Sequence, residues 1–284
     1  MYRGPRVELH PGVARAQGIA LPPGELRWLS HVSLAPEHVL AIVWWSKNYA
    51  VYRRFADQFN QFPVQYFQFT INPRDEDLSW LEPDIPPLAE VLGQVEFLAA
   101  RPGGPELISW RYDPLVFWSE GGVERSSWRP AFFEQMCREL SQIGVRRCVT
   151  SLADPYARFR QRLVRYFPEK RLREPAPAEL DELTGQMAAC AATYGMKLEA
   201  CTEGRLAQSD GFAAARCIDG NCLAPRAGTT WPPATDVKVK GREECGCTLH
   251  TDVGDYQAQE CGYGCVYCYA YPNHRRFESL GFPD

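Results

Sequence analysis

Apolar and polar positions along the first two hundred residues form two repeating patterns, short strand-like runs and longer helical stretches. The clearest run, Val39–Trp45, is apolar throughout, which predicts a strand buried on both faces. Aromatic and β-branched side chains predict a second strand over Val64–Thr70. The other runs of strand character are 107–112, 147–152 and 197–201, with Arg6–His10 as a further candidate.

Each of these runs is followed by a stretch with helical spacing. The residues Phe133, Met136, Cys137 and Leu140 recur at intervals of three or four, which predicts an amphipathic helix over about residues 130–143. Pro177 is a favoured first-turn residue and Gly195 a favoured stop, so another helix lies between them. The remaining helices are expected over about 50–61, from the Pro-rich loop 73–87 to residue 100, and over 155–166.

Five alternations of strand and helix predict an α/β fold with a parallel sheet and right-handed crossovers. The strand count favours a partial (β/α) barrel, related to the TIM barrel, or an open doubly wound sheet. In both architectures the chemistry lies at the carboxyl ends of the strands. The periodicity stops after residue 203, so we expect a β/α partial barrel over 1–203 and an irregular, Cys-rich segment over 204–284 packed on it.

Composition narrows the class of protein. The 284 residues are 45% hydrophobic and 23% charged, which is ordinary for a globular protein and too apolar for a disordered one. A net charge of −4 gives no general attraction for polyanions. The longest apolar run is far shorter than the roughly 20 residues of a membrane helix, and the start shows no signal-peptide stretch. We therefore expect a cytoplasmic protein without a membrane partner.

Cysteine is the most informative residue type. Of the 11 cysteines, 8 lie between Cys201 and Cys268. Such a density indicates disulfides in a secreted chain and metal ligands in a cytosolic one. Since no export signal is visible, we interpret these cysteines as metal ligands. The earlier Cys137, Cys148 and Cys190 are typical of buried apolar positions.

The sharpest motif is Cys261-Gly-Tyr-Gly-Cys265-Val-Tyr-Cys268. Three thiolates so close in sequence can bind three irons of a [4Fe–4S] cluster and leave the fourth iron open. Gly262 and Gly264 allow the chain to wrap tightly, and Tyr267 would shield the cluster from solvent. Zinc is the alternative, although it prefers paired Cys-x2-Cys elements and this stretch holds one such pair.

The spacing is similar to that of the radical S-adenosylmethionine (SAM) enzymes. In those enzymes the open iron binds the amino and carboxylate groups of SAM, and reduction cleaves SAM to a 5′-deoxyadenosyl radical. The resemblance therefore implies SAM as a second cofactor and an electron donor such as ferredoxin or flavodoxin as a partner.

A second metal centre is indicated by the other cysteines of this region. Cys245-Gly-Cys247 is too tight for an unstrained disulfide and suits two ligands of one centre. Four of the five could hold a second iron–sulfur cluster or a zinc ion and so order the segment. The five cysteines are Cys201, Cys217, Cys222, Cys245 and Cys247.

Motifs along most of the chain resemble an uncharacterised microbial family noted for a C-terminal cysteine cluster like that of radical SAM enzymes. The matching stretches, within about residues 32–271, include Trp45-Ser-Lys-Asn48, Trp110-Arg-Tyr-Asp-Pro114, Ser151-Leu-Ala-Asp-Pro-Tyr156, Cys201-Thr-Glu203, Cys217-Ile-Asp219, Cys245-Gly-Cys247 and the Cys261–Cys268 motif. The resemblance implies a radical-SAM-like barrel and selects Cys201, Cys217, Cys245 and Cys247 as the second site, with Cys222 as the spare. The family's usual N-terminal Ser-Arg-Arg-Thr-Asp type motif has no counterpart in Met1–Leu29.

Polar residues that follow the expected strands are candidates for contacts with SAM and substrate. Structural caps and ion pairs are the alternative, because several of them stand next to Pro in turns. The candidate catalytic residues are Lys47, Arg111, Asp113, Asp154 and Glu203, and the candidate cofactor-binding residues are Asn48, Tyr156 and Tyr267.

A basic stretch over residues 158–173 allows two interpretations. Phe159, Leu163 and Phe167 would face the core, so the arginines between them form a solvated helix face. The alternative is a nucleic-acid contact. The basic residues are Arg158, Arg160, Arg162, Arg165, Lys170, Arg171 and Arg173.

Two classes of function remain. The first is a radical-SAM-like enzyme that reductively cleaves SAM and starts radical chemistry on an unknown substrate. The second is a non-catalytic iron–sulfur or zinc protein that senses redox state or binds nucleic acid. A fourth ligand for the Cys261–Cys268 motif, from Cys222 or His250, would favour the second class.

Overall fold

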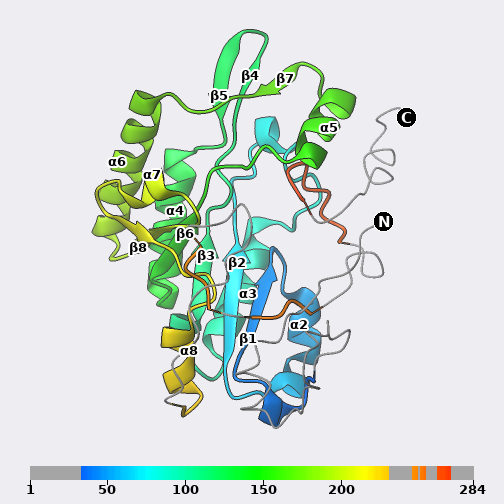
Figure 1. Ribbon diagram of the computed structural model, residues 1–284, viewed down its shortest axis with the longest axis vertical. Coiled ribbons are helices and arrows are strands. Elements are labelled where there is room, and N and C mark those ends of the chain that lie inside the picture. The colour runs from blue at the N-terminus through cyan, green and yellow to red at the C-terminus, as the bar shows by residue number, and fades with distance from the viewer. Residues whose placement is uncertain (1–32, 230–244, 249, 254–260, 270–284) are drawn as a thin grey trace, which may run out of the picture.

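Six parallel strands form the main sheet of the protein, seen in the computed structural model of Figure 1. The structure describes residues 33–229, 245–248, 250–253 and 261–269. The strands pair in the order β1-β2-β3-β6-β8-β9. Their bounds are β1 Ile42–Ser46, β2 Gln65–Thr70, β3 Ile108–Arg111, β6 Arg147–Thr150, β8 Lys197–Ala200 and β9 Phe212–Ala214.

Helices connect these strands. The α-helices are α2 Ala50–Phe55, α3 Leu88–Ala99, α4 Pro130–Ile143, α5 Ala157–Tyr166, α6 Pro177–Thr193, α7 Gly204–Ala207 and α8 Gly220–Arg226. The 3-10 helices are η1 Pro36–His38, η2 Ala56–Phe59, η3 Glu76–Leu78 and η4 Pro105–Leu107. No helix within the described residues is both long and apolar enough to cross a membrane.

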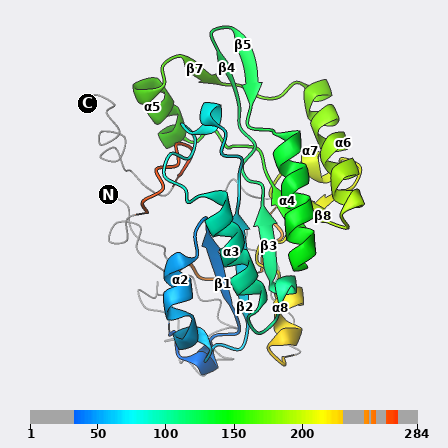
Figure 2. The same ribbon diagram turned by 180° about the vertical axis from the view of Figure 1, so that it is seen from behind.

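The strand order follows the chain order without a reversal. Each right-handed crossover therefore steps the same way across the sheet and leaves its helix on the same face. Figure 2 shows α3 and α4 in front of the sheet on that face. Phe69, Trp110 and Phe133, all fully buried, form the centre of the core between the helices and the strands. A doubly wound sheet, which requires a reversal, is excluded for the described strands, and β1 and β9 end the sheet rather than closing a barrel.

The opposite face of the sheet carries buried polar side chains. Gln68 of β2 lies in register with Ser109 of β3, and both have 0% exposure. The C-terminal part of the chain covers this face: Leu223 of α8 packs in one cluster with Tyr66, and Cys247 packs in another with Val149. The described part of the Cys-rich segment around α8 and Cys247 thus belongs to the fold's interior.

A second, antiparallel sheet was not foreseen from the sequence. It contains β4 Phe117–Glu120, β5 Val123–Ser126 and β7 Lys170–Leu172, in the order β5-β4-β7. Gly121 and Gly122 connect β4 and β5 with φ values of 59° and 80°, a backbone that glycine adopts without strain. The strands are three or four residues long, and β5 and β7 consist mostly of exposed or half-buried polar residues, so the sequence shows no apolar run there.

Two expectations from the sequence need correction. The first strand is not buried on both faces: it is β1, at the edge of the sheet, and Trp45 is 51% exposed. The chain beyond residue 203 is not irregular throughout, because α7, β9 and α8 lie there and β9 pairs with β8. The candidate strand Arg6–His10 and the segment Met1–Leu29 lie outside the described residues.

We predict that Gly144→Ala destabilises the protein. Gly144 ends α4 with φ of 100°, and a Cβ there would lie 2.8 Å from Cγ of Pro105. The strain is expected to lower the free energy of unfolding by about 1–3 kcal/mol, measured by urea denaturation. Gly93→Ala, inside α3 where a Cβ meets nothing within 4 Å, is the control and is expected to stabilise by up to about 1 kcal/mol. Equal effects of the two changes would contradict this account.

Candidate functional site

The loop that carries Cys261, Cys265 and Cys268, termed the three-cysteine loop, is anchored to the rest of the fold (Figure 1, beside α5). Val266 is fully buried and its backbone N–H donates to the carbonyl of Leu81 at 3.0 Å. The guanidinium of Arg162, on α5, donates to the carbonyls of Val266 at 2.9 Å and Cys268 at 2.5 Å. These bonds fix the backbone between the second and third cysteines.

The three thiols are half-buried and lie in one electrostatic environment. Burial raises the pKa of the Cys265 thiol, the Lys47 ammonium opposes this, and Glu82, Cys268 and Cys261 raise it further. Gly264 has φ of 61°, so the turn between the first two cysteines uses the conformational freedom of glycine. Within the described residues, no three His, Cys, Asp or Glu side chains converge closely enough to hold a single metal ion.

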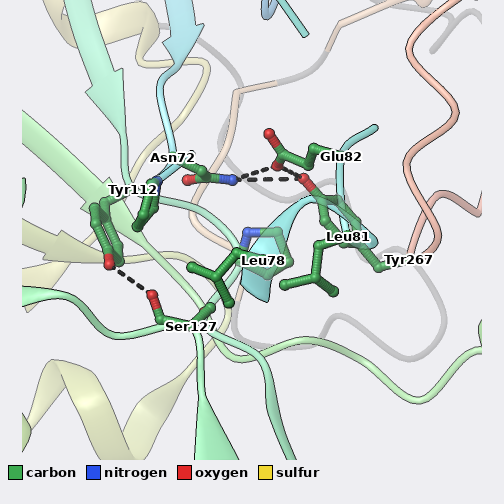
Figure 3. Close-up of a pocket in the computed structure, with 9 residues that line it drawn as sticks. Asn72, Leu78, Leu81, Glu82, Tyr112, Ser127 and Tyr267 are labelled. Carbon is green, nitrogen blue, oxygen red and sulfur yellow. Dashed lines mark hydrogen bonds between the residues drawn. The ribbon is translucent and has the colours of Figure 1, made fainter. Parts of the chain in front are cut away.

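A buried carboxylate, Glu82, lies beside this loop. It is 7% exposed and accepts hydrogen bonds from Lys47 Nζ at 2.9 Å, Asn72 Nδ2 at 2.6 Å and the Tyr267 hydroxyl. Figure 3 shows Asn72, Glu82 and Tyr267 turned toward one another. Burial alone would raise the pKa of Glu82, but the Lys47 charge and the hydrogen bonds from Tyr267, Lys47 and Asn72 lower it below its usual value, which favours the anion.

Next to Tyr267 lies a small cavity lined in part by Leu78, Leu81 and Tyr112 (Figure 3). Its volume is about 10 Å³, which is space for about one water molecule. A ligand the size of a nucleoside does not fit there. Such a ligand of the three-cysteine loop would have to approach from the half-exposed side of the thiols.

A second group of thiols lies on the polar face of the sheet, after the last two strands. Cys201 follows β8 and Cys217 follows β9, and their sulfur atoms are 3.3 Å apart. Cys247 and Cys245 pack in the same cluster, and we call these four residues the four-cysteine group. Hydrogen bonds from Cys201 and Cys247, together with the Arg111 guanidinium, lower the pKa of Cys217 well below its usual value.

Hydrogen bonds connect the two groups of cysteines. Arg111 is 3% exposed, and its guanidinium donates to Cys217 Sγ at 3.0 Å and to Asp113 Oδ2 at 2.8 Å. The backbone of Asp113 exchanges two hydrogen bonds, each 2.9 Å, with the Asn72 side chain. Because Asn72 also donates to Glu82, a continuous polar path runs from Cys217 to the three-cysteine loop.

The comparisons with known proteins give the family. Residues 19–270 match the family described as "Domain of unknown function (DUF1848)". The chain belongs to this family. No curated protein matches the sequence.

Among solved structures, the DUF1848 chain is similar to one described as "Crystal structure of D-hydantoinase", with 10% identity and a TM-score of 0.28. The match covers 58% of this chain and 34% of that one, so the chain spans about a third of the length of this relative. A likeness of this size supports no argument about function.

The structure brings together only part of the candidate residues from the sequence. Lys47, Arg111, Asp113 and Tyr267 all belong to the polar path or border it. Asn48 accepts a hydrogen bond from the Ala50 N–H at the start of α2. This is the role of a structural cap, the alternative to a contact with SAM or substrate.

The other candidates lie apart from this path. Asp154 is exposed and accepts a hydrogen bond from the Tyr156 hydroxyl at 2.6 Å. Tyr156 lies against Tyr269, with 5.7 Å between ring centroids, and so borders the end of the three-cysteine loop. Glu203 precedes α7, close in sequence to Cys201, and its carbonyl accepts from the Ala207 N–H. Cys222 and His250 contact Arg226 and Thr248 respectively and are not placed at the three-cysteine loop.

The basic stretch 158–173 contains both exposed and buried side chains. Phe159, Leu163 and Phe167 are buried as predicted. Arg162 is 2% exposed, so the expectation of a solvated side chain is wrong for this residue. It holds the three-cysteine loop instead.

Sequence reasoning missed Asn72 and Glu82. Asn72 stands two residues after β2, so the rule that polar residues follow strands could have found it. Glu82 lies between η3 and α3 in the Pro-rich loop, where neither spacing nor a motif distinguishes it from the neighbouring acidic residues.

Proposed function

We propose that this DUF1848 protein is a radical-SAM-like iron–sulfur enzyme that reductively cleaves SAM to start radical chemistry on a substrate still to be found. The observation that supports this most is the position of the three-cysteine loop. It is anchored next to Lys47, Asn72 and Asp113, which follow the carboxyl ends of three adjacent parallel strands. Catalytic groups of α/β barrels are drawn from this edge.

The residues fit a [4Fe–4S] cluster at Cys261, Cys265 and Cys268. All three donors are half-buried cysteines on one anchored loop and form no disulfide within the described residues, and thiolates are the ligands that iron–sulfur clusters require. The spacing of the three cysteines contains one Cys-x2-Cys pair, whereas zinc sites prefer two such pairs, so the loop suits a cluster better than a zinc ion. The unreversed strand order supports a partial barrel of the radical-SAM type as the finer description of the fold.

When bound, such a cluster would supply the electron that cleaves SAM, taken from a donor such as ferredoxin or flavodoxin. The side chains of this protein would bind and orient SAM. Lys47 and Arg111 are cations suited to its carboxylate, and Asp113 is a carboxylate suited to its ammonium or ribose hydroxyls. Asn48, Tyr156, Asp154 and Glu203 are proposed to contribute from the rim of the site.

The four-cysteine group is proposed to hold a second centre, either an iron–sulfur cluster or zinc. Its donor set is chemically suitable for both, because all four thiols are free and packed in one cluster. Arg111 would offset part of the negative charge of these thiolates. The role of this centre would be to fasten the C-terminal segment to the polar face of the sheet.

The test is SAM cleavage by the full-length protein. After anaerobic reconstitution with iron and sulfide, reduction by dithionite in the presence of SAM is expected to yield 5′-deoxyadenosine, measured by mass spectrometry. Cys268→Ala is expected to stop this, and Cys222→Ala, outside both groups of ligands, is the matched control. If SAM leaves the EPR spectrum of the reduced cluster unchanged and no 5′-deoxyadenosine forms, the protein is an iron–sulfur sensor or binding protein instead.

A further inference from the structure

Glu82 is the point at which three separate segments meet. Its donors come from the end of β1 (Lys47), from the end of β2 (Asn72) and from the three-cysteine loop (Tyr267). All three hydrogen bonds end on Oε1 of this buried carboxylate, so one oxygen atom holds the three segments in a defined arrangement.

The arrangement places a pair of opposite charges next to the thiols. Lys47 Nζ lies 2.9 Å from Glu82 Oε1 and 5.5 Å from the centroid of the Tyr267 ring. Tyr267 itself stands between Cys265 and Cys268 in the loop. The side chains of Lys47 and Glu82 are only 14% and 6% exposed, so water screens their charges from the thiols much less than it would at the surface.

We propose that Glu82 is a positioning residue that holds the three-cysteine loop through Tyr267, and that the Lys47–Glu82 pair sets the reduction potential of the cluster on that loop. The inference rests on the cluster of the proposed function, but it does not depend on SAM cleavage. Nothing in the sequence marks Glu82 for this role, which is visible only from its three bonds.

The physical consequence is that substitutions of Glu82 and Lys47 shift the reduction potential of the cluster in opposite directions. Reduction adds one negative charge to the cluster. Removing the Glu82 charge therefore favours the reduced state, and removing the Lys47 charge disfavours it. A purely structural role predicts no such contrast, because both substitutions break the same ion pair and would disturb the loop in the same direction.

The experiment is an EPR-monitored redox titration of the reconstituted, full-length protein. At a fixed potential, Glu82→Gln is expected to raise the ratio of reduced to oxidised cluster by about tenfold, and Lys47→Met to lower it by about as much. The double variant is expected to have a midpoint potential close to that of the wild-type protein. Lys47→Arg keeps the positive charge and is expected to keep the wild-type midpoint potential.

A second lysine–glutamate pair provides the matched control. Lys170 Nζ lies 2.5 Å from Glu120 Oε1, on the small antiparallel sheet, and Glu120→Gln and Lys170→Met are expected to leave the midpoint unchanged. As a measurement independent of metal, Glu82→Ala, which removes the acceptor of the Tyr267 hydroxyl, should also speed alkylation of Cys265 in the metal-free protein, because the loop loses its tie through Tyr267.

The outcomes separate this inference from the proposed function. Shifts of the same sign, or no shift, in a protein that holds its cluster overturn the role of Glu82 and leave the proposed function standing. Opposite shifts in a protein that does not cleave SAM support the role of Glu82 and overturn the enzymatic proposal. A protein that binds no iron at all overturns both.

Discussion

Replacing Cys265 by alanine is expected to remove the iron and labile sulfide held by the three-cysteine loop while the parallel sheet stays folded. Two thiolates, Cys261 and Cys268, would remain on a loop that supplies no third, and a cluster bound through two ligands is lost readily. The loop's backbone anchors do not involve the Cys265 thiol, so the fold keeps its contacts. Iron and sulfide per chain and the visible absorption measure the loss, and circular dichroism measures the fold.

The control for this prediction is Cys190→Ala. Cys190 is a half-buried free thiol on α6 that packs against the core around Met187, and its loss should leave the iron content unchanged. Wild-type protein that contains one equivalent of zinc and no iron after anaerobic preparation would contradict the prediction. So would a Cys265→Ala variant with its full iron content.

Replacing Cys247 by serine is expected to release the centre held by the four-cysteine group and to loosen the segment that covers the polar face of the sheet. Cys247 is 6% exposed and packs against Val149 and Ala215. Where a metal joins segments that have little apolar surface of their own, its binding energy becomes folding energy, about 10 kcal/mol or more for structural zinc. Limited proteolysis should therefore cut the chain beyond residue 215 many times faster, and one metal equivalent should be lost.

Cys222→Ser is the matched control for Cys247→Ser. Cys222 lies on α8, a short distance along the same C-terminal region, and its thiol contacts Arg226 rather than the four-cysteine group. Its replacement should leave both metal content and digestion pattern unchanged. Equal protease sensitivity of the two variants would show that local packing, and not a metal, orders the segment.

Much of the fold could be predicted because the signal is local. The helix α4, Pro130–Ile143, has the bounds that its spacing predicts, since Phe133, Met136, Cys137 and Leu140 all face the core. Strands β2, β3, β6 and β8 agree with their apolar runs to within two residues at each end. The predicted strands β3 and β6 are as short but almost wholly buried. Strands β5, β7 and β9 are largely exposed or half-buried and β4 is buried only in its first half, so their residues form no apolar run and their pairing depends on their partners.

The cysteines of the candidate site could be singled out from the sequence, and their surroundings could not. Cysteine spacing singled out the three-cysteine loop, and the resemblance to a family selected the four-cysteine group, which the structure brings together on the sheet. The buried roles of Arg162 and Glu82 were not predictable. Each is a charged residue in a stretch rich in charge or in proline, and each has a partner in the three-cysteine loop, more than one hundred residues away in the sequence.

The sequence alone determined the α/β class, the bounds of the long helices, the membership of a family and the cysteines that are candidates for metal binding. These properties follow from short-range periodicity and from residue type, which are complete in a single stretch of chain. The tertiary structure alone decided that β1 is an edge strand, that the C-terminal segment covers the polar face, and that Arg111, Asn72 and Glu82 connect the two groups of cysteines. Such properties depend on which distant segments meet, and that choice is made by the packing of the whole chain.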